Sequence, residues 1–375
     1  MLRFLFGWFA WELTASAFWV GTIAGLMLMP ALVLSPLFGV LADQINPRNG
    51  LLATVGLQGM LAAITALIHA LDVLTLQSLA VLALAFGVVT SAHTPIRLAM
   101  LPRLVERGAL PSAIGYSAMV FNSSRILGPA LGAWMLTVSS VTMVFAASAT
   151  FMGLAVLLLL RVSGLTEVAG SQESPALLAQ LREGVRYAVG HTDLRLVFTL
   201  TLASGLLGRT FIELLPAVSG ALLDGDATTL AILTAGAGAG SILGGLIVSR
   251  QGGRTRQLYR LVLSGLSLAA LVLLSMSLWG ALPVVAVAVG CVSLATTVVG
   301  TGNQALTQLM IDESYRGRVM SLWTVVAMGT PAVGAVLLGT LADRVGFVAA
   351  MALPAVAVLV LVMISRQVLI RQAGS

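Results

Sequence analysis

The sequence predicts an all-α integral membrane protein. Three observations support this prediction: the hydrophobicity of the chain, the length of its apolar runs and the placement of its arginines. Of the 375 residues, 58% are hydrophobic and only 9% are charged, and the mean hydropathy is +1.03. A soluble globular protein carries about 25% charged residues, so this chain has too few charges to cover a water-facing surface. The composition argues against an ordinary soluble enzyme and a secreted disulfide-rich domain. Helices are expected because a backbone exposed to lipid must satisfy its own hydrogen bonds.

Eleven apolar runs reach the length of about 20 residues that a helix needs to cross the hydrocarbon core. In chain order they cover residues 18–42, 50–71, 74–96, 112–136, 139–161, 196–222, 227–249, 258–279, 281–309, 319–341 and 347–365. A shorter apolar segment, Met1–Trp11, precedes them and has about half the length of a span. We interpret it as the second half of a first helix. The sequence therefore predicts twelve helices, the first of them truncated either in the chain itself or by the choice of start codon.

The arginines predict the orientation of these helices. All 20 basic residues are arginines, and the formal net charge is +6. Seventeen of them lie at the chain ends and in the loops of one side, whereas the loops of the other side contain Arg344 alone. Because cytoplasmic loops carry the excess of basic residues, we expect both termini and the linker of residues 162–194 in the cytoplasm, and the chain in the plasma (inner) membrane. The arginines do not form the clustered basic patch that nucleic-acid binding requires.

The chain repeats itself on either side of the linker. The string Gly39–Asp43 followed by Arg48 has the spacing of Gly245–Ser249 followed by Arg254, and Pro129–Gly132 matches Pro331–Gly334. Two repeated halves are the plan of many secondary transporters. We expect an N-terminal helical bundle at residues 1–161 and a C-terminal bundle at residues 195–375.

The linker is the one substantial polar segment of the sequence. Its stretch Pro175–Val189 places Leu177, Leu178, Leu181, Val185 and Ala188 on one helical face. It is therefore predicted to form an amphipathic helix that lies along the membrane.

These motifs resemble the major facilitator superfamily, and within it the enterobactin-exporter-like and drug-efflux branch. The strings that carry the resemblance are Gly39–Arg48, Thr94–Pro102, Asn122–Ala133, Leu181–Tyr187 and Asp312–Ser321. The resemblance covers nearly the whole chain. It implies a major facilitator fold of two six-helix bundles related by a pseudo-two-fold repeat, in a protein that is a monomer. It also implies proton-coupled export of a small amphiphilic compound, a drug or a siderophore by alternating access.

The same resemblance assigns roles to two groups of residues. The candidate gating residues at the cytoplasmic helix ends are Gly39, Asp43, Arg48, Gly245 and Arg254. Ordinary capping of helix ends is the other interpretation of these residues. The helix-5 motif of exporters corresponds to Gly128, Pro129 and Gly132.

Charged residues inside predicted spans are the strongest candidates for a transport site, because a charge in a membrane is costly and faces a cavity or a partner. Arg125 falls inside the fifth helix, and Arg209 and Glu213 are spaced i, i+4 on the seventh, so they share a face. Three interpretations stay open: a titratable switch at Glu213, a permanent ion pair, or an anion-binding cavity. The polar residues expected to line the same central cavity are Gln58, Asn122, Asn303 and Gln304.

The sequence gives no indication of a cofactor, a metal site or an enzyme. It contains no Gly-Lys-Ser/Thr phosphate loop, so ATP is not expected as the energy source, and its single cysteine, Cys291, excludes an intrachain disulfide and a multi-cysteine metal site. Two alternatives to an exporter remain: a lipid or lysophospholipid flippase of the same fold, and a non-transporting receptor or degenerate paralogue.

Overall fold

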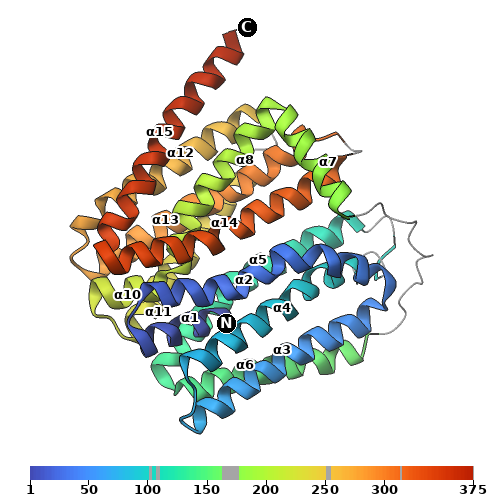
Figure 1. The fold of residues 1–375 in the computed structure, drawn as a ribbon, viewed down its shortest axis with the longest axis vertical. Helices are drawn as coiled ribbons and strands as arrows, with labels where there is room; N and C mark the ends of the chain where they lie inside the picture. Colours follow the sequence, from blue (N-terminus) through green and yellow to red (C-terminus); the bar gives the residue numbers. More distant parts are fainter. Residues whose placement is uncertain (101–103, 107–109, 163–176, 251–254, 313–314, 375) are drawn as a thin grey trace. The chain divides into compact units, whose positions relative to one another are not determined.

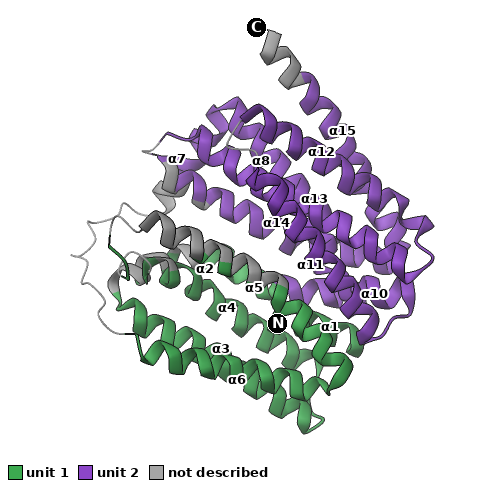
Figure 2. Cartoon of the chain, turned by 180° about the vertical axis from the view of Figure 1, so that it is seen from behind, with its two compact units in different colours: residues 1–13, 26–177 green, residues 14–25, 178–375 purple. Residues whose placement is uncertain are grey.

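The computed structural model describes residues 1–100, 104–106, 110–162, 177–250, 255–312 and 315–374. Within these ranges the chain is helical and has no strand, and ten helices are long and apolar enough to cross a membrane. The prediction of an all-α membrane protein is therefore confirmed. The chain forms two compact units: residues 1–13 with 26–177 are unit 1, and residues 14–25 with 178–375 are unit 2 (Figure 2).

Unit 1 contains the first six helices, apart from the start of the second. They are α1 (Leu2–Thr14), α2 (Ala17–Gln44), α3 (Pro47–Ala70), α4 (Leu76–Met100), α5 (Leu110–Val138) and α6 (Val141–Leu160) (Figure 1). At 1.5 Å per residue, the 13 residues of α1 extend about 20 Å. The Phe6 ring of α1 packs edge-on against Phe145 of α6 and lies close to Phe86 of α4, with centroid distances of 5.8 and 6.3 Å. These aromatic contacts anchor α1 in the core of unit 1.

Local sequence explains where these helices begin. Asn46 precedes α3 in an extended conformation, and its side chain accepts a hydrogen bond from the Arg48 backbone N–H at 3.0 Å. Pro47 occupies the first turn, where its missing N–H leaves no intrahelical bond unmade. Ser140 caps α6 in the same way by accepting from the Met143 N–H.

Unit 2 contains the remaining elements. They are α7 (Leu177–Gly190), α8 (Thr192–Ser204), the π-helical turn η3 (Gly205–Arg209), α9 (Thr210–Glu213), α10 (Leu215–Leu223), α11 (Ala227–Ser249), α12 (Thr255–Leu274), the 3-10 turn η4 (Ser275–Leu278), α13 (Leu282–Met310), α14 (Arg316–Val345) and α15 (Phe347–Gly374). The predicted span 227–249 coincides with α11. The predicted span 196–222 is instead divided into α8, η3, α9 and α10.

The tightest helix pair of unit 2 is α11 with α13. A Cβ atom added to Gly236 would lie 2.7 Å from the Ala286 carbonyl oxygen, and one added to Gly244 would lie 2.6 Å from that of Leu294. The Ser293 hydroxyl donates to the Ala237 carbonyl at 2.7 Å. Lipid tails are as apolar as the side chains, so close backbone approach and interhelical hydrogen bonds must hold such a pair together. The glycines of α11 supply that approach.

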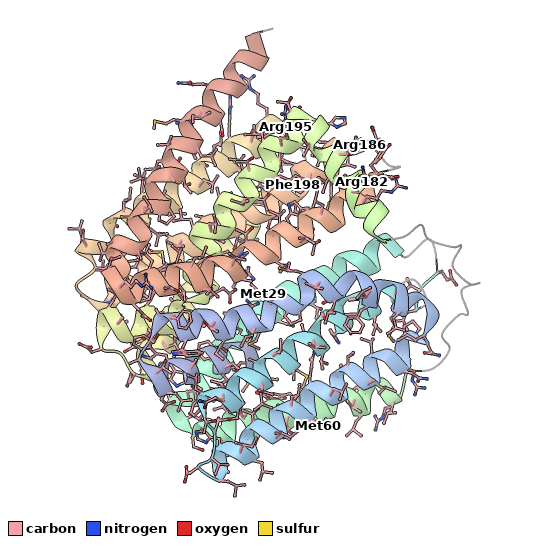
Figure 3. All side chains as sticks on the ribbon, in the orientation of Figure 1. Met29, Met60, Arg182, Arg186, Arg195 and Phe198 are labelled. Carbon is pink, nitrogen blue, oxygen red and sulfur yellow. The ribbon has the colours of Figure 1, made fainter. Side chains whose placement is uncertain are left out.

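The linker helix α7 is docked on unit 2 by polar and aromatic contacts. Glu183 forms an ion pair of 2.6 Å with Arg318 at the start of α14. The Tyr187 hydroxyl donates to Asp312 at 2.9 Å, and the Tyr187 ring stacks on Tyr315 at 4.3 Å. The side chains of Arg182, Val185, Arg186 and Val189 on α7 are exposed and face away from these contacts. Figure 3 labels the two arginines. One face of α7 is thus fixed to unit 2, and the other is cationic with two exposed valines.

Candidate functional site

The membrane span that contains the candidate ion pair is interrupted by a π-helical turn. The regular helix α8 gives way to η3 at Gly205, and the Thr210 hydroxyl donates to the Gly205 carbonyl at 2.9 Å, five residues back. The helix breaks again at Leu214, just before Pro216 in the first turn of α10. A proline lacks an N–H group, and its ring clashes with the carbonyl four residues back, here that of Ile212, so the preceding helix cannot continue through Pro216. π-Turns inside helices occur frequently at functional sites.

Close packing surrounds this turn. A Cβ atom on Gly205 would lie 2.8 Å from the Thr330 Cβ atom of α14, and one on Gly208 would collide with the Thr296 hydroxyl of α13. On the other side of the contact, a Cβ atom on Gly334 of α14 would collide with the Thr210 hydroxyl. Small residues therefore allow η3 and α9 to approach α13 and α14 closely.

Arg209 and Glu213 form an ion pair at this turn. The Arg209 Nε atom lies 3.4 Å from the Glu213 Oε1 atom, and the two side chains retain 27% and 13% of their exposure. The guanidinium compensates the carboxylate inside a span, where an unpaired charge would be costly. The arrangement is compatible with a permanent pair and with a pair that protonation of Glu213 would weaken.

The other predicted cavity residues of unit 2 lie on α13. Asn303 is fully buried, whereas Gln304 is exposed. Asn303 follows Thr296 by seven residues, so it lies two turns away on the α13 face that meets η3 and α8. Among the described residues, Asn303 is one of the few whose buried side-chain polar atoms have no hydrogen-bond partner.

Gln58 lies in unit 1, in a polar strip between α3 and α4. Its side-chain amide donates to the Thr90 hydroxyl at 3.4 Å. One turn away, the Thr54 hydroxyl lies 3.3 Å from His93 Nδ1. The structure thus brings Arg209 and Glu213 together and places Gln58 in a separate polar cluster. The side chains of Asn122 and Arg125 fall outside the described residues.

Arg48 joins the start of α3 to the end of α6. Its Nε atom donates to the Leu159 carbonyl at 3.2 Å, and its Nη2 atom donates to the Leu160 carbonyl at 2.5 Å. The last carbonyls of a helix have no intrahelical partner and form the negative end of the helix dipole, so a cation is favoured there. This geometry is that of an anchor between two helices of unit 1.

The other candidate gating residues are described in part. Gly39 and Asp43 lie in the carboxyl-terminal turns of α2, where their side chains are outside the described residues, as is Arg254. Gly245 lies on α11, and a Cβ atom added there would meet nothing within 4 Å.

The helix-5 motif gives room to α1. A Cβ atom on Gly128 would lie 2.9 Å from the Met1 nitrogen, and one on Gly132 would lie 3.2 Å from Met1 Cγ and 3.4 Å from Phe4 Cδ1. Pro129 lies inside α5 between these two glycines. The spacing of the motif therefore fits a small-residue surface on which α1 packs.

Sequence reasoning missed the role of Asp343. The string Gly339–Asp343 lies in the last turns of α14, which ends at Val345. The Asp343 carboxylate accepts hydrogen bonds from the backbone N–H groups of Ala17 and Phe18 at 2.8 and 3.0 Å. Among the described residues, no group of three or more His, Cys, Asp or Glu side chains could hold a metal ion.

Comparison with solved structures identifies the fold. The chain superposes on a bacterial homologue of the human lysosomal transporter Spinster with a TM-score of 0.67, at 13% identity and with 97% of this chain and 94% of the other covered. The nucleoside transporter NupG gives a TM-score of 0.66, at 13% identity and with 96% of each chain covered. The expected major facilitator fold is confirmed.

Comparison of sequences identifies the family. The Staphyloferrin A transporter of Staphylococcus aureus is 24% identical over 351 residues, which cover 91% of this chain and 85% of that protein. The multidrug efflux pump Tap of Mycobacterium tuberculosis is 27% identical over 374 residues, which cover 94% and 86%. The model of the transmembrane secretion effector family matches residues 4–375. These relatives are transporters and not enzymes, and the chain belongs to the transmembrane secretion effector family of the major facilitator superfamily.

Proposed function

We propose that this membrane transporter is a secondary active exporter, which moves a small amphiphilic compound, a drug or a siderophore outward in exchange for protons. Its relatives include a siderophore transporter and a multidrug efflux pump. Alternating access would open the path first to one side of the membrane and then to the other. The bias of the arginines toward one set of loops supports a cytoplasmic location for both termini in the plasma membrane.

The observation that carries the proton-coupling proposal is the Arg209–Glu213 pair in an interrupted span. A carboxylate can take up a proton, whereas a guanidinium keeps its charge in proteins. Protonation of Glu213 would remove the negative partner of Arg209 and change the net charge of the pair from zero to +1. A turn that already departs from regular helix geometry is a suitable place for the accompanying rearrangement.

The experiment compares Glu213→Gln with Glu183→Gln in proteoliposomes that carry an imposed pH gradient. Glutamine retains the size of the side chain and cannot change its charge. Glu183 also pairs with an arginine, Arg318, but lies on α7, outside the candidate membrane spans, so it is the matched control. Transport is followed with a macrolide and with Staphyloferrin A as probes, and proton flux with an internal pH-sensitive dye.

We expect Glu213→Gln to abolish gradient-driven accumulation and the coupled proton flux while retaining exchange of labelled for unlabelled probe. Glu183→Gln should retain both activities. A Glu213→Gln protein that accumulates a probe as strongly as the parent would contradict the coupling role. A lower unfolding temperature with unchanged coupling would identify the pair as a structural ion pair.

A further inference from the structure

The amino end of α2 is bound by a carboxylate that comes from another helix more than 300 residues away. Asp343 of α14 accepts the backbone N–H groups of Ala17 and Phe18 at 2.8 and 3.0 Å, and it also accepts the Ser16 hydroxyl. The first N–H groups of a helix have no partner inside the helix, and a carboxylate beside them is favoured by hydrogen bonding and by the helix dipole. Asp343 therefore acts as an N-cap for α2, a role that is ordinarily filled by the residue at the start of the same helix.

A seam of small residues continues this contact along both helices. A Cβ atom on Gly339 would collide with the Ala17 carbonyl oxygen, and one on Gly21 would collide with that of Ala335. A Cβ atom on Gly25 would lie 3.2 Å from the Val336 side chain. The two backbones thus touch over two helical turns, which explains why residues 14–25 cluster with unit 2 although the rest of α2 clusters with unit 1.

The sequence of the seam resembles the candidate gating string at the other end of α2. Gly339-Thr-Leu-Ala-Asp343 has the same first, third, fourth and fifth residues as Gly39-Val-Leu-Ala-Asp43. The α2 helix belongs by sequence to the first repeat, and α14 belongs to the second. The same short string therefore lies at the carboxyl end of both helices, and the arginine distribution predicts these two ends on opposite sides of the membrane.

We propose that Asp343 is a positioning residue of the transport cycle, a latch that holds the amino-terminal turns of α2 on α14 and must release them when the outer side opens. This inference rests on the proposed alternating-access function and on the outer location of this helix end that the arginine distribution predicts. No substrate contact is involved. The latch acts through two backbone N–H groups and one hydroxyl, which lose their shared acceptor when the helices part.

The expected change in the population with α2 released depends on how many hydrogen bonds to Asp343 each substitution removes. Asp343→Ala removes the acceptor for all three donors, whereas Asp343→Asn retains one neutral acceptor oxygen. Loss of a single capping side chain changes a helix equilibrium by about twofold to thirtyfold. We expect Asp343→Ala to raise the population with α2 released by a factor in that range, and Asp343→Asn to give an intermediate increase.

The test measures thiol accessibility from the outer side in a Cys291→Ala background. A single cysteine replaces Val20, which is fully buried and lies between Ala17 and Gly21 on α2. A second protein carries its single cysteine at Ala270, which is fully buried in α12. Cells are treated with a membrane-impermeant maleimide, and the rate of modification is measured for each protein with and without the Asp343 substitutions.

Asp226→Ala is the matched control. Asp226 is also a capping carboxylate on the predicted outer side, but it accepts from Thr229 N–H at 2.9 Å within its own helix, α11. We expect it to leave the labelling rate of Val20→Cys unchanged, while Asp343→Ala raises that rate and leaves the rate of Ala270→Cys unchanged.

Two outcomes would overturn the latch. Equal labelling of Val20→Cys with and without Asp343→Ala would show that the carboxylate does not hold α2. An equal increase in the labelling rate at Ala270→Cys, with Asp343→Ala and also with the milder Asp343→Asn, would show general loosening of unit 2 instead of release of α2. Labelling requires no substrate, so failure of proton coupling in the Glu213→Gln assay would leave this result intact and can be told apart from it.

Discussion

The contact between α11 and α13 permits a quantitative prediction, because two neighbouring glycines of α11 differ only in what they face. A Cβ atom on Gly244 would lie 2.6 Å from the Leu294 carbonyl oxygen, whereas one on Gly245 would meet nothing within 4 Å. Ordinary van der Waals contact begins at 3.4 Å and extends to 4 Å. In Gly244→Ala, α13 must therefore withdraw by 0.8 to 1.4 Å, the differences between 2.6 Å and these two limits.

The free energy of unfolding should separate the two variants. Replacing glycine with alanine in a helix interior gains up to about 1 kcal/mol of helix propensity. Overpacking of a close contact costs about 1–3 kcal/mol. The propensity gain applies equally to both substitutions, so the difference between the two variants measures the packing cost alone. We expect Gly244→Ala to be less stable than Gly245→Ala by about 1–3 kcal/mol.

The assay is reversible unfolding of each purified variant by sodium dodecyl sulfate in mixed micelles, followed by circular dichroism. Gly245→Ala should unfold at the same detergent fraction as the parent or a higher one, and Gly244→Ala at a lower one. Coincident unfolding curves for the two variants would refute the conclusion that backbone contact at Gly244 holds the helix pair together.

Three further predictions concern helix ends outside the interior of the membrane. Arg48→Lys should lower stability by about 1 kcal/mol in the same unfolding assay, because the single ammonium nitrogen of lysine cannot reproduce the two separate, fixed donors, Nε and Nη2, with which Arg48 reaches the two carbonyls at the end of α6. Asp226→Ala should cost about 1 kcal/mol at pH 7. The Thr229 N–H lowers the pKa of Asp226 below its ordinary value of 3.8, so the stabilisation by this carboxylate is complete above pH 3.8 and disappears as the pH falls through the lowered pKa. A stability difference between the parent and Asp226→Ala that stays constant from pH 7 down to pH 2 would contradict this. Burial foremost, together with the Asp312 carboxylate, raises the pKa of Tyr187 above 10.0, so its stabilising contact is complete below pH 10 and is lost as the pH rises through the raised value. The difference in phenolate absorbance between the parent and Tyr187→Phe should show a midpoint above 10, and a midpoint at or below 10 would argue against the contact.

The positions of most helices follow from the sequence because the thickness of the hydrocarbon core imposes a length on every apolar run. The predicted span 227–249 has the bounds of α11, and 281–309 differs from α13 by one residue at each end. The interruption of 196–222 was not predicted. Pro216 signals the second break, but η3 depends on how Gly205 and Gly208 pack against other helices, and no local pattern contains that information.

The candidate site shows the same division between local and distant causes. The spacing of Arg209 and Glu213 predicts a shared face, and their charged groups lie 3.4 Å apart. By contrast, the capping of α2 by Asp343 joins residues 326 positions apart, and neither string contains a signal for its partner. The roles of Asn122 and Arg125 stay predictions, since their side chains lie outside the described residues.

The pairing of a guanidinium with a carboxylate restricts the sign of the charge that this part of the span can present. Because only Glu213 can change its protonation state, the pair is neutral or singly positive and never negative. The positive state repels cations and attracts anions. A cationic cargo would therefore compete with the proton, as exchange in opposite directions requires, whereas an anionic cargo would bind together with it and favour cotransport. Under the proposed coupling at this pair, the charge of the cargo would therefore decide in which direction a pH gradient could drive it.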